Sequence, residues 1–428
     1  MKVLLYTQNY SPRLKYISAF IFKEVMGVEC NVTCDLEEFK SYGDLKINYS
    51  NSPICEKELY ILPVNLLFEK NIVPQSIECF EINNNKAFFK IDHADFSFDI
   101  FAASFYLLSR YEEYLPHQKD IYGRYAHENS LAFKEGFLQL PLINIWANSF
   151  VAALQNKFPS FIFIHRPFRF IPTYDIDIAF SYKHKGLLRN AGGFLKSPSL
   201  ERIMVVCGWR KDPFDTYEWM DTLHKKFQLN PVYFFLVAAQ NGGYDKNILP
   251  ANKAMWQLVK KHAEKYSIGI HPSWQSGDDI SLLKKEIVQL KTMSQQEITR
   301  CRQHYIRFNL PEGYRRLLKE GITDDYSMGY GSINGFRASA ASAFYWFDLE
   351  KNEISSLRVH PFCFMEANAY YEQKLTVTEA YEELMQYYWA CKNVDGTLIT
   401  IWHNQMLGPD KLYDGWAAMY ENFLKAIG

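Results

Sequence analysis

Two aspartates stand one residue apart in the stretch PTYDIDIAF, which covers residues 172–180. Asp175 and Asp177 follow the apolar run FRFIPTY (168–174), which predicts a buried strand. Burying two unpaired carboxylates is costly in free energy, so a cation or water should meet them there. A bound metal ion would meet both requirements.

Three histidines occupy comparable places along the chain. His271 ends the short run SIGIH and His403 ends TLITIWH, whereas His304 stands at the beginning of the strand-like run HYIRF. A single histidine beside a strand is more often a hydrogen-bonded core residue than a ligand. Together with the two aspartates, however, these histidines supply enough ligands for a catalytic metal site with one position open to water.

The chain from about residue 161 onward alternates strand-like and helix-like runs. Expected strands cover residues 168–174, 231–239, 267–271, 304–308 and 397–403. Expected helices begin near Asp215, which would be an N-cap, and near Tyr413, and others cover residues 253–266, 281–293, 311–321 and 376–392. Thr376 and Glu379 predict a capping box at the start of the last of these. Repeated βα units predict a parallel sheet, and their number favours a closed or nearly closed (β/α) barrel. Barrel enzymes carry their sites at the C-terminal ends of the strands, where the Asp pair, His271 and His403 fall.

The first 165 residues have a different pattern. They combine β-rich runs at residues 58–68 and 86–92 with a helix expected over residues 99–115. We expect an α/β accessory domain over residues 1–165, followed by a catalytic domain over residues 166–428. Two roles stay open for the first domain, covering the site or recruiting a partner.

Composition argues against several functional classes. The chain has 428 residues, with 47 Lys and Arg against 48 Asp and Glu, so no basic field favours nucleic acid as a partner. No run approaches the ~20 apolar residues of a membrane-spanning helix, and the N-terminus predicts a strand instead of a signal peptide. Eight cysteines without a CxxC pair fit a reducing compartment, so we expect a cytoplasmic protein.

The motifs TYDID, IGIHPSW, RQHYIRF and TIWHN, in this order, resemble the successive motifs of the polysaccharide deacetylase family, carbohydrate esterase family four. The resemblance covers roughly residues 165–428 and implies a distorted (β/α) barrel. It also implies that Asp175 is the general base and Asp177 a metal ligand. His403 would be the general acid, and Arg302 would orient the base.

The chain departs from this family pattern at two places. The second motif normally carries another metal histidine four residues after His271, where this chain has Gln275. The third motif normally has proline where this chain has His304. We therefore expect Asp177, His271 and His304 to hold one divalent ion, zinc first, with cobalt, nickel and manganese as alternatives. In the rival interpretation, water or Gln275 completes the site, or the metal is lost.

Aromatic residues near these motifs fit a carbohydrate substrate. Trp274 and Trp402 adjoin two of the motifs and would suit packing on a sugar ring, although either would equally suit the core. Residues 324–344 are rich in small side chains and predict an active-site loop, with Tyr330 and Arg337 as substrate contacts.

The expected reaction is hydrolytic removal of an N-acetyl group from an amino-sugar glycan or glycan precursor. His403 would protonate the departing amine, with Asp325 or Glu366 as its tether. Two alternatives stay open. One is a glycan-binding protein on a decayed deacetylase scaffold, and the other is a different metal-dependent amide or ester hydrolase of envelope or capsule metabolism.

Overall fold

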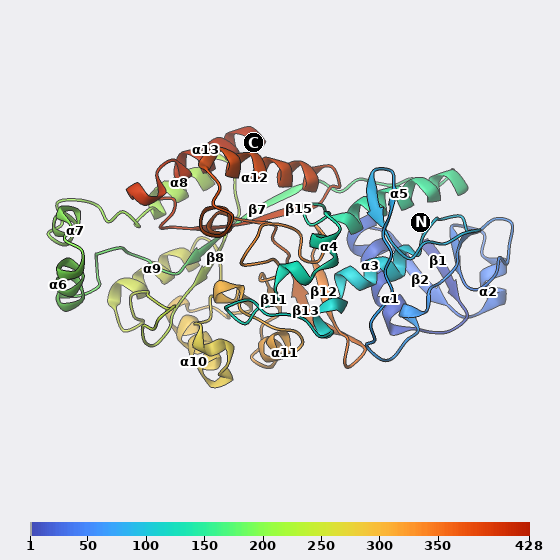
Figure 1. The fold of residues 1–428 in the computed structure, drawn as a ribbon, viewed down its shortest axis with the longest axis horizontal. Helices are drawn as coiled ribbons and strands as arrows, with labels where there is room; N and C mark the ends of the chain where they lie inside the picture. The colour runs from blue at the N-terminus through green and yellow to red at the C-terminus, as the bar shows by residue number, and fades with distance from the viewer. Residues whose placement is uncertain (1) are drawn as a thin grey trace.

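The computed structural model describes residues 2–428, and the molecule is elongated (Figure 1). A small sheet formed by N-terminal residues lies at one end, and a larger sheet built within residues 169–403 fills the centre. Two helices, α6 (Leu187–Lys196) and α7 (Leu200–Val206), stand apart from the rest at the opposite end.

Four parallel strands form the small sheet in the order β2-β1-β3-β4. The strands are β1 Lys2–Thr7, β2 Glu29–Thr33, β3 Lys46–Tyr49 and β4 Leu59–Ile61, and β5 Phe80–Ile82 and β6 Asn85–Ala87 form a separate hairpin. The helices are α1 Pro12–Ala19, α2 Leu36–Ser41, α3 Ile100–Leu108, α4 Leu131–Lys134 and α5 Leu142–Lys157. The N-terminal region thus mixes helices and strands as expected, whereas the domain boundary at residue 165 stays a prediction.

Helix α3 ends earlier than the sequence predicts. The helical pattern covers residues 99–115, but the α-helix stops at Leu108 and a 3₁₀ turn follows at Tyr111–Tyr114. Arg110 separates the two with a left-handed φ of 55°, which breaks the helix. The break leaves Glu113 against Arg337, a residue far along the chain.

Nine strands form the larger sheet in the order β12-β13-β11-β10-β9-β8-β7-β15-β14. Neighbours are parallel, except that β12 runs antiparallel to β13. The bounds are β7 Arg169–Ile176, β8 Val232–Phe235, β9 Ser267–Ile270, β10 Arg300–Cys301, β11 Asp324–Asp325, β12 Phe344–Asp348, β13 Glu353–Val359, β14 Phe364–Met365 and β15 Thr397–His403. Among residues 2–428 no ladder joins the end strands β12 and β14, so the closed barrel stays a prediction.

Helices pack along the larger sheet, with α12 and α13 beside β7 and β15 and with α10 and α11 on the other side (Figure 1). Their bounds are α8 Tyr217–Lys226, α9 Lys253–Ala263, α10 Ile280–Ser294, α11 Glu312–Lys319, α12 Val377–Lys392 and α13 Trp416–Ile427. Thr376 and Glu379 form the expected capping box at the start of α12. The expected cap at Asp215 is wrong by one position, because Thr216 is the residue that precedes α8.

The run HYIRF is not the strand that its composition predicts. Strand β10 is Arg300–Cys301, and a 3₁₀ turn follows at His304–Ile306. Tyr305 and Ile306 have φ angles of 58° and 54°, left-handed values that an extended strand does not contain. His304 therefore does not start a strand. Like the other motif residues, it lies at the C-terminal end of one.

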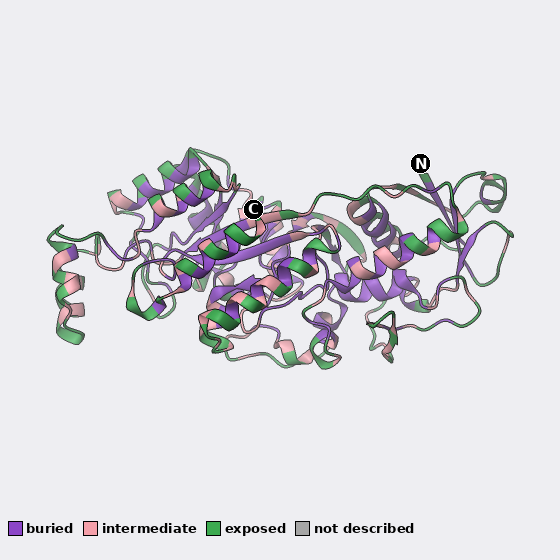
Figure 2. Cartoon of the chain, turned by 90° about the horizontal axis from the view of Figure 1, so that it is seen from above, coloured by how far each residue is buried: buried purple, intermediate pink, exposed green. Residues whose placement is uncertain are grey.

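One continuous hydrophobic core joins the two sheets, and Figure 2 shows the buried residues along the interior of the molecule. Tyr16 and Phe105 from the N-terminal region pack on Phe347 of β12, with ring centroids 5.0 Å and 5.3 Å apart. The N-terminal region is thus packed against an edge strand of the larger sheet. Within the described residues, no helix has the length and apolar character needed to cross a membrane.

Candidate metal centre

The ends of parallel strands place the motif residues at one edge of the larger sheet. Asp175 lies in β7, and Asp177 directly follows that strand. His403 ends β15, and His271 directly follows β9. His403 and Asp175 are register partners on adjacent strands. Because parallel strands present their C-terminal ends on one side, residues from distant sequence positions meet here.

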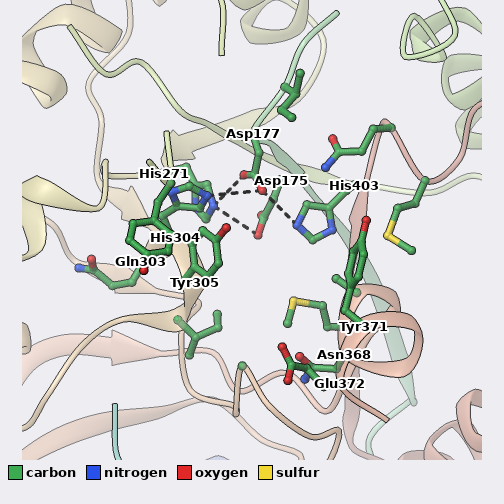
Figure 3. A pocket seen from close by; sticks show the side chains of 18 of the residues that line it. Asp175, Asp177, His271, Gln303, His304, Tyr305, Asn368, Tyr371, Glu372 and His403 are labelled. Atoms are coloured by element: carbon green, nitrogen blue, oxygen red, sulfur yellow. Dashed lines mark ion pairs between the residues drawn. The ribbon is translucent and has the colours of Figure 1, made fainter. Parts of the chain in front are cut away.

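Asp177 lies between three imidazoles. Its carboxylate oxygens are 3.0 Å from Nε2 of His271, 3.6 Å from Nε2 of His304 and 3.5 Å from Nε2 of His403. Figure 3 shows His271 and His304 on one side of Asp177 and His403 on the other. One donor atom from each of Asp177, His271 and His304 lies within 4.8 Å of the others. The fold therefore brings together the three ligands that the sequence predicts.

In His271 and His304, the two imidazoles that are candidate ligands, Nδ1 lies against a hydrogen-bond acceptor. Nδ1 of His271 lies 2.6 Å from the backbone carbonyl of Arg302, and Nδ1 of His304 lies 3.0 Å from Oδ1 of Asp245. A carbonyl can only accept, so Nδ1 of His271 must carry the proton. Its Nε2 is then the nitrogen directed at Asp177, the orientation that a metal-ligating imidazole requires.

His403 is oriented by Glu366, one of the two tethers considered from the sequence. Nδ1 of His403 lies 3.0 Å from Oε1 of Glu366, and the backbone N–H of His403 donates to the same oxygen. Glu366 is buried and follows β14, the strand next to β15. Asp325, the other candidate, accepts hydrogen bonds from Tyr314 and Ser327 instead.

Arg302 fixes one oxygen of Asp175. Its Nη1 donates to Oδ1 of Asp175 at 2.9 Å and to Oγ1 of Thr173 at 2.7 Å. Its Nε donates to the Tyr326 carbonyl at 3.0 Å, and its guanidinium lies 4.5 Å from the ring centroid of Phe234. Both partners of the Asp175–Arg302 pair are buried, which makes the orientation of Asp175 rigid.

The electrostatics of the site favour positive charge beside Asp177. Burial alone would raise the pKa of the Asp177 carboxyl, but His304 and His271 hold it well below its usual range. Burial alone would lower the pKa of His403, but Glu366 and Asp177 raise it to about 10. The Asp177 carboxyl is therefore kept in its ionised form, which is the form that a metal ligand needs.

The hydrogen bonding of Asp177 also fits a metal ligand. Among the described residues, its buried Oδ1 has no hydrogen-bond partner. A buried carboxylate oxygen without a donor is destabilising, whereas coordination to a metal would satisfy it. Imidazole nitrogens and a carboxylate oxygen are ligands that zinc and its neighbouring divalent metals accept. The residues present therefore fit the divalent ion expected from the sequence.

The site opens into a cavity of about 460 Å³. Its lining includes Asp175, Asp177, His271, His304, His403, Gln303, Tyr244, Tyr305, Asn368, Tyr371, Glu372 and two N-terminal residues, Tyr122 and Arg124. Nη1 of Arg124 donates to the Tyr305 carbonyl at 2.6 Å, directly after His304. The ring of Tyr122 lies 5.5 Å from that of Tyr305. The N-terminal region therefore supplies part of the cavity wall, a role that the sequence left open.

All four residues expected to contact substrate are absent from this lining, within the part of the chain that the structure describes, and three of them are core residues. Arg337 forms a buried ion pair with Glu113, at 2.6 Å, and Tyr330 is buried as well. Trp402 is buried against Tyr420, with ring centroids 4.3 Å apart. The expectation is corrected for Arg337, Tyr330 and Trp402, because the core already occupies their side chains.

Trp274 lies just behind the lining, and Gln275 is also outside it. The indole of Trp274 stacks on Tyr244, a lining residue, with ring centroids 3.9 Å apart. Gln275 begins a 3₁₀ turn and is likewise not among the described lining residues. A substrate contact by Trp274 stays a prediction, and the rival ligand set with Gln275 gains no support.

Asp245 is the important residue of the site that sequence reasoning missed. It lies in the loop between β8 and α9, at the same edge of the sheet as the ligands. A carboxylate after an expected strand was the available signal, as it was for Asp177. No motif singled it out, because its role is to hold His304, whose position depends on the turn after β10.

Comparisons with known proteins give one family match and several structural neighbours, including two polysaccharide deacetylase structures. A family of unknown function, DUF7033, matches residues 3–159, and no curated protein matches the chain. A putative polysaccharide deacetylase from Mycobacterium smegmatis is similar with a TM-score of 0.40 and 13% identity, over 62% of this chain and 85% of its own. The polysaccharide deacetylase Bc1974 from Bacillus cereus is similar with a TM-score of 0.32 and 13% identity, over 61% of this chain and 88% of its own. Both neighbours are polysaccharide deacetylases, and at this degree of similarity membership of that family stays a proposal for this chain.

Proposed function

We propose that the chain is a metal-dependent hydrolase that removes an N-acetyl group from an amino-sugar glycan or glycan precursor. One observation carries the proposal: the Asp177 carboxylate faces three imidazole Nε2 atoms, beside a second carboxylate held by Arg302. A binding module would need neither an oriented base nor an oriented acid next to a ligand cluster.

Asp177, His271 and His304 would hold the divalent ion. When bound, such an ion supplies Lewis-acid polarisation of the amide carbonyl and a water of lowered pKa. Asp175 accepts a proton from the attacking water. Arg302 occupies its Oδ1, so Oδ2 is the oxygen available for this transfer.

His403 acts as the general acid. Its Nδ1 is held by Glu366, and its Nε2 faces the cavity 3.5 Å from Asp177. As the carbon–nitrogen bond breaks, the proton on Nε2 passes to the amine and the products are acetate and an amino sugar. The base and the acid come from the adjacent strands β7 and β15, so their relative position is set by the sheet.

The cavity supports a carbohydrate substrate. Tyr122, Tyr244 and Tyr305 contribute aromatic rings to its lining, beside the polar side chains of Gln303 and Asn368. A sugar ring has apolar faces and a hydroxylated edge, which this combination suits. A reducing, cytoplasmic setting stays part of the proposal and rests on the cysteine pattern of the sequence.

The test combines metal content with acetate release from N-acetylated amino-sugar oligomers. Wild type should carry about one divalent ion per chain, and His271→Ala and His304→Ala should lose it. Asp175→Asn should keep the ion and lose acetate release, which separates metal binding from proton transfer. Lys40→Ala, at an exposed ion pair remote from the site, is the matched control.

Three results would contradict parts of the proposal. Retention of the ion by His304→Ala would remove His304 from the ligand set. If the wild type takes up no zinc, cobalt, nickel or manganese but binds glycans, the decayed-scaffold alternative replaces the enzyme. Full activity on amides or esters without sugar would favour the other hydrolase class.

A further inference from the structure

Residues 183–211, which we call the arm, form a helical excursion from the body of the protein. The arm contains α6 and α7 and lies beyond the end of the larger sheet (Figures 1 and 2). Of the residues described in α6, none is buried, and in α7 only Val205 is. The two helices therefore lack the packing that normally stabilises helices of this length.

Large apolar side chains concentrate on this arm. Eight large hydrophobic residues in the described chain are more than three-quarters exposed. Five of them lie inside the arm, in a single stretch of 23 residues. The five are Leu187 at 80%, Leu188 at 92%, Leu195 at 83%, Leu200 at 78% and Trp209 at 79%. Exposed apolar groups gathered in this way mark an interaction surface, whereas isolated ones do not.

The apolar residues of α6 share one face of the helix. Leu187, Leu188 and Leu195 recur at positions i, i+1 and i+8, so they point to the same side at 3.6 residues per turn. Arg189 and Lys196 fall on the opposite side. The helix is amphipathic, but its apolar side faces no other part of the described chain.

The arm is also strongly basic. It holds seven cationic residues, Lys183, Lys185, Arg189, Lys196, Arg202, Arg210 and Lys211, against one acidic residue, Glu201. The whole chain has a net charge of −1, so this excess of positive charge is local. Glu201 is itself paired with Arg210, at 3.2 Å. The surface that would bury these leucines should therefore carry negative charge.

We propose that the arm docks on an anionic membrane surface, with its leucines and Trp209 inserted and its lysines and arginines at the lipid phosphates. A short amphipathic helix with basic flanks is the chemistry that lies in a bilayer interface without crossing it. A second copy of the chain fits less well, because two arms that meet face to face would bring together two strongly positive surfaces.

The base of the arm is fixed beside the candidate metal centre. Asp212 accepts hydrogen bonds at 2.8 Å from the backbone N–H groups of Ser181, Tyr182 and Lys183, which closes the loop at its root. Ile178 before the arm and Phe214 after it both line the cavity. Docking would thus bring the mouth of the cavity toward substrates held at that surface, a consequence that rests on the proposed function.

Vesicle co-sedimentation of the full chain tests the docking itself. Wild type should bind phosphatidylcholine vesicles that contain phosphatidylglycerol, bind pure phosphatidylcholine much more weakly, and dissociate as salt rises. Leu188→Gln/Leu195→Gln should weaken binding by roughly a hundredfold. Lys183→Glu/Lys196→Glu should abolish the preference for the anionic lipid.

A matched control uses two residues of similar exposure outside the arm. Ile162 and Ile164 are 77% and 78% exposed, and Ile162→Gln/Ile164→Gln should bind vesicles as wild type does. Subtracting the emission spectrum of Trp209→Phe from that of wild type gives the emission of Trp209. This emission should shift to shorter wavelength when anionic vesicles are added. Circular dichroism checks that each variant is folded.

Failure to bind anionic vesicles, or equal binding by wild type and Leu188→Gln/Leu195→Gln, would overturn the proposal. A dimer in light scattering that this double variant converts to a monomer would assign the face to a second copy instead. Vesicle binding does not depend on acetate release, so loss of one and retention of the other separates this inference from the proposed function.

Discussion

Two clusters of buried charge in this molecule are built in opposite ways. In the first, Glu113 accepts from Nε of Arg110 and Nε of Arg337 at 2.8 Å each, and from Nη2 of Arg337 at 2.6 Å. In the second, Asp177 faces three imidazoles, and its Oδ1 has no hydrogen bond among the described residues. Both clusters join residues that are far apart in sequence, but only in the first do both oxygens of the central carboxylate accept hydrogen bonds from protein groups.

This difference between the two clusters distinguishes charges that stabilise the fold from charges that are arranged to bind a ligand. A carboxylate whose two oxygens both accept from arginines stabilises the fold and has no oxygen left to bind a ligand. A buried carboxylate that faces several free imidazole nitrogens is unsatisfied until a cation arrives. This contrast explains why Arg337, an attractive substrate contact in the sequence, belongs to the core.

The largest effect is expected at the site cluster, from Asp175→Asn. The amide can still accept from Arg302, so the fold and the metal content should persist, while the proton acceptor is lost. We expect kcat to fall roughly a thousandfold, about 4 kcal/mol in barrier height. Steady-state acetate release checks this, with elemental analysis as control. A variant that keeps more than a tenth of wild-type activity would remove Asp175 from the role of base.

The paired cluster should respond in stability. Arg337→Ala leaves Glu113 buried with one partner fewer, and we expect the free energy of unfolding to fall by about 3 kcal/mol or more. Denaturant unfolding measures this. The exposed pair of Lys40 and Glu37 gives a control, since Lys40→Ala should change the free energy by less than about 0.5 kcal/mol. If the two substitutions lowered the free energy of unfolding equally, the buried pair would stabilise the fold no more than the exposed pair does.

The same cluster should make the free energy of unfolding fall at acid pH. Burial alone would raise the pKa of Glu113, but Arg337 and Arg110 lower it to about 2 from its ordinary 4.5. Because the folded-state pKa is depressed, the stabilisation is complete above about pH 4.5 and is lost as pH falls toward 2. It amounts to roughly 3 kcal/mol, at 1.36 kcal/mol for each pKa unit. Unfolding free energies of wild type and Glu113→Gln should therefore converge below pH 4.5, and a constant difference would contradict the pairing.

The smallest effect is expected at the residue that holds His304. Asp245→Asn keeps an acceptor for Nδ1 of His304 but removes the charge, so metal affinity should fall by about 10- to 100-fold. Competition with a chelator measures the affinity. Asp278→Asn, at an exposed ion pair with Arg307, is the control and should leave affinity unchanged. An unchanged affinity in Asp245→Asn would mean that Asp245 does not support the ligand.

Much of the scaffold follows from local patterns. The runs at residues 168–174 and 397–403 became β7 and β15, and the capping box at Thr376 formed as expected, because apolar periodicity and caps act over a few residues. The run HYIRF failed as a strand, since two left-handed residues turn the chain there. Local composition does not encode that turn.

The sequence by itself determined which residue types stand at the ends of the expected strands, and the parallel arrangement was enough to predict that Asp177, His271 and His403 meet. Only the tertiary structure decided that Glu366 and not Asp325 holds His403, and that Arg337 pairs with Glu113. The physical reason is that these contacts join residues 37 and 224 positions apart. Their geometry depends on how the strands and loops pack, which no short stretch of sequence specifies.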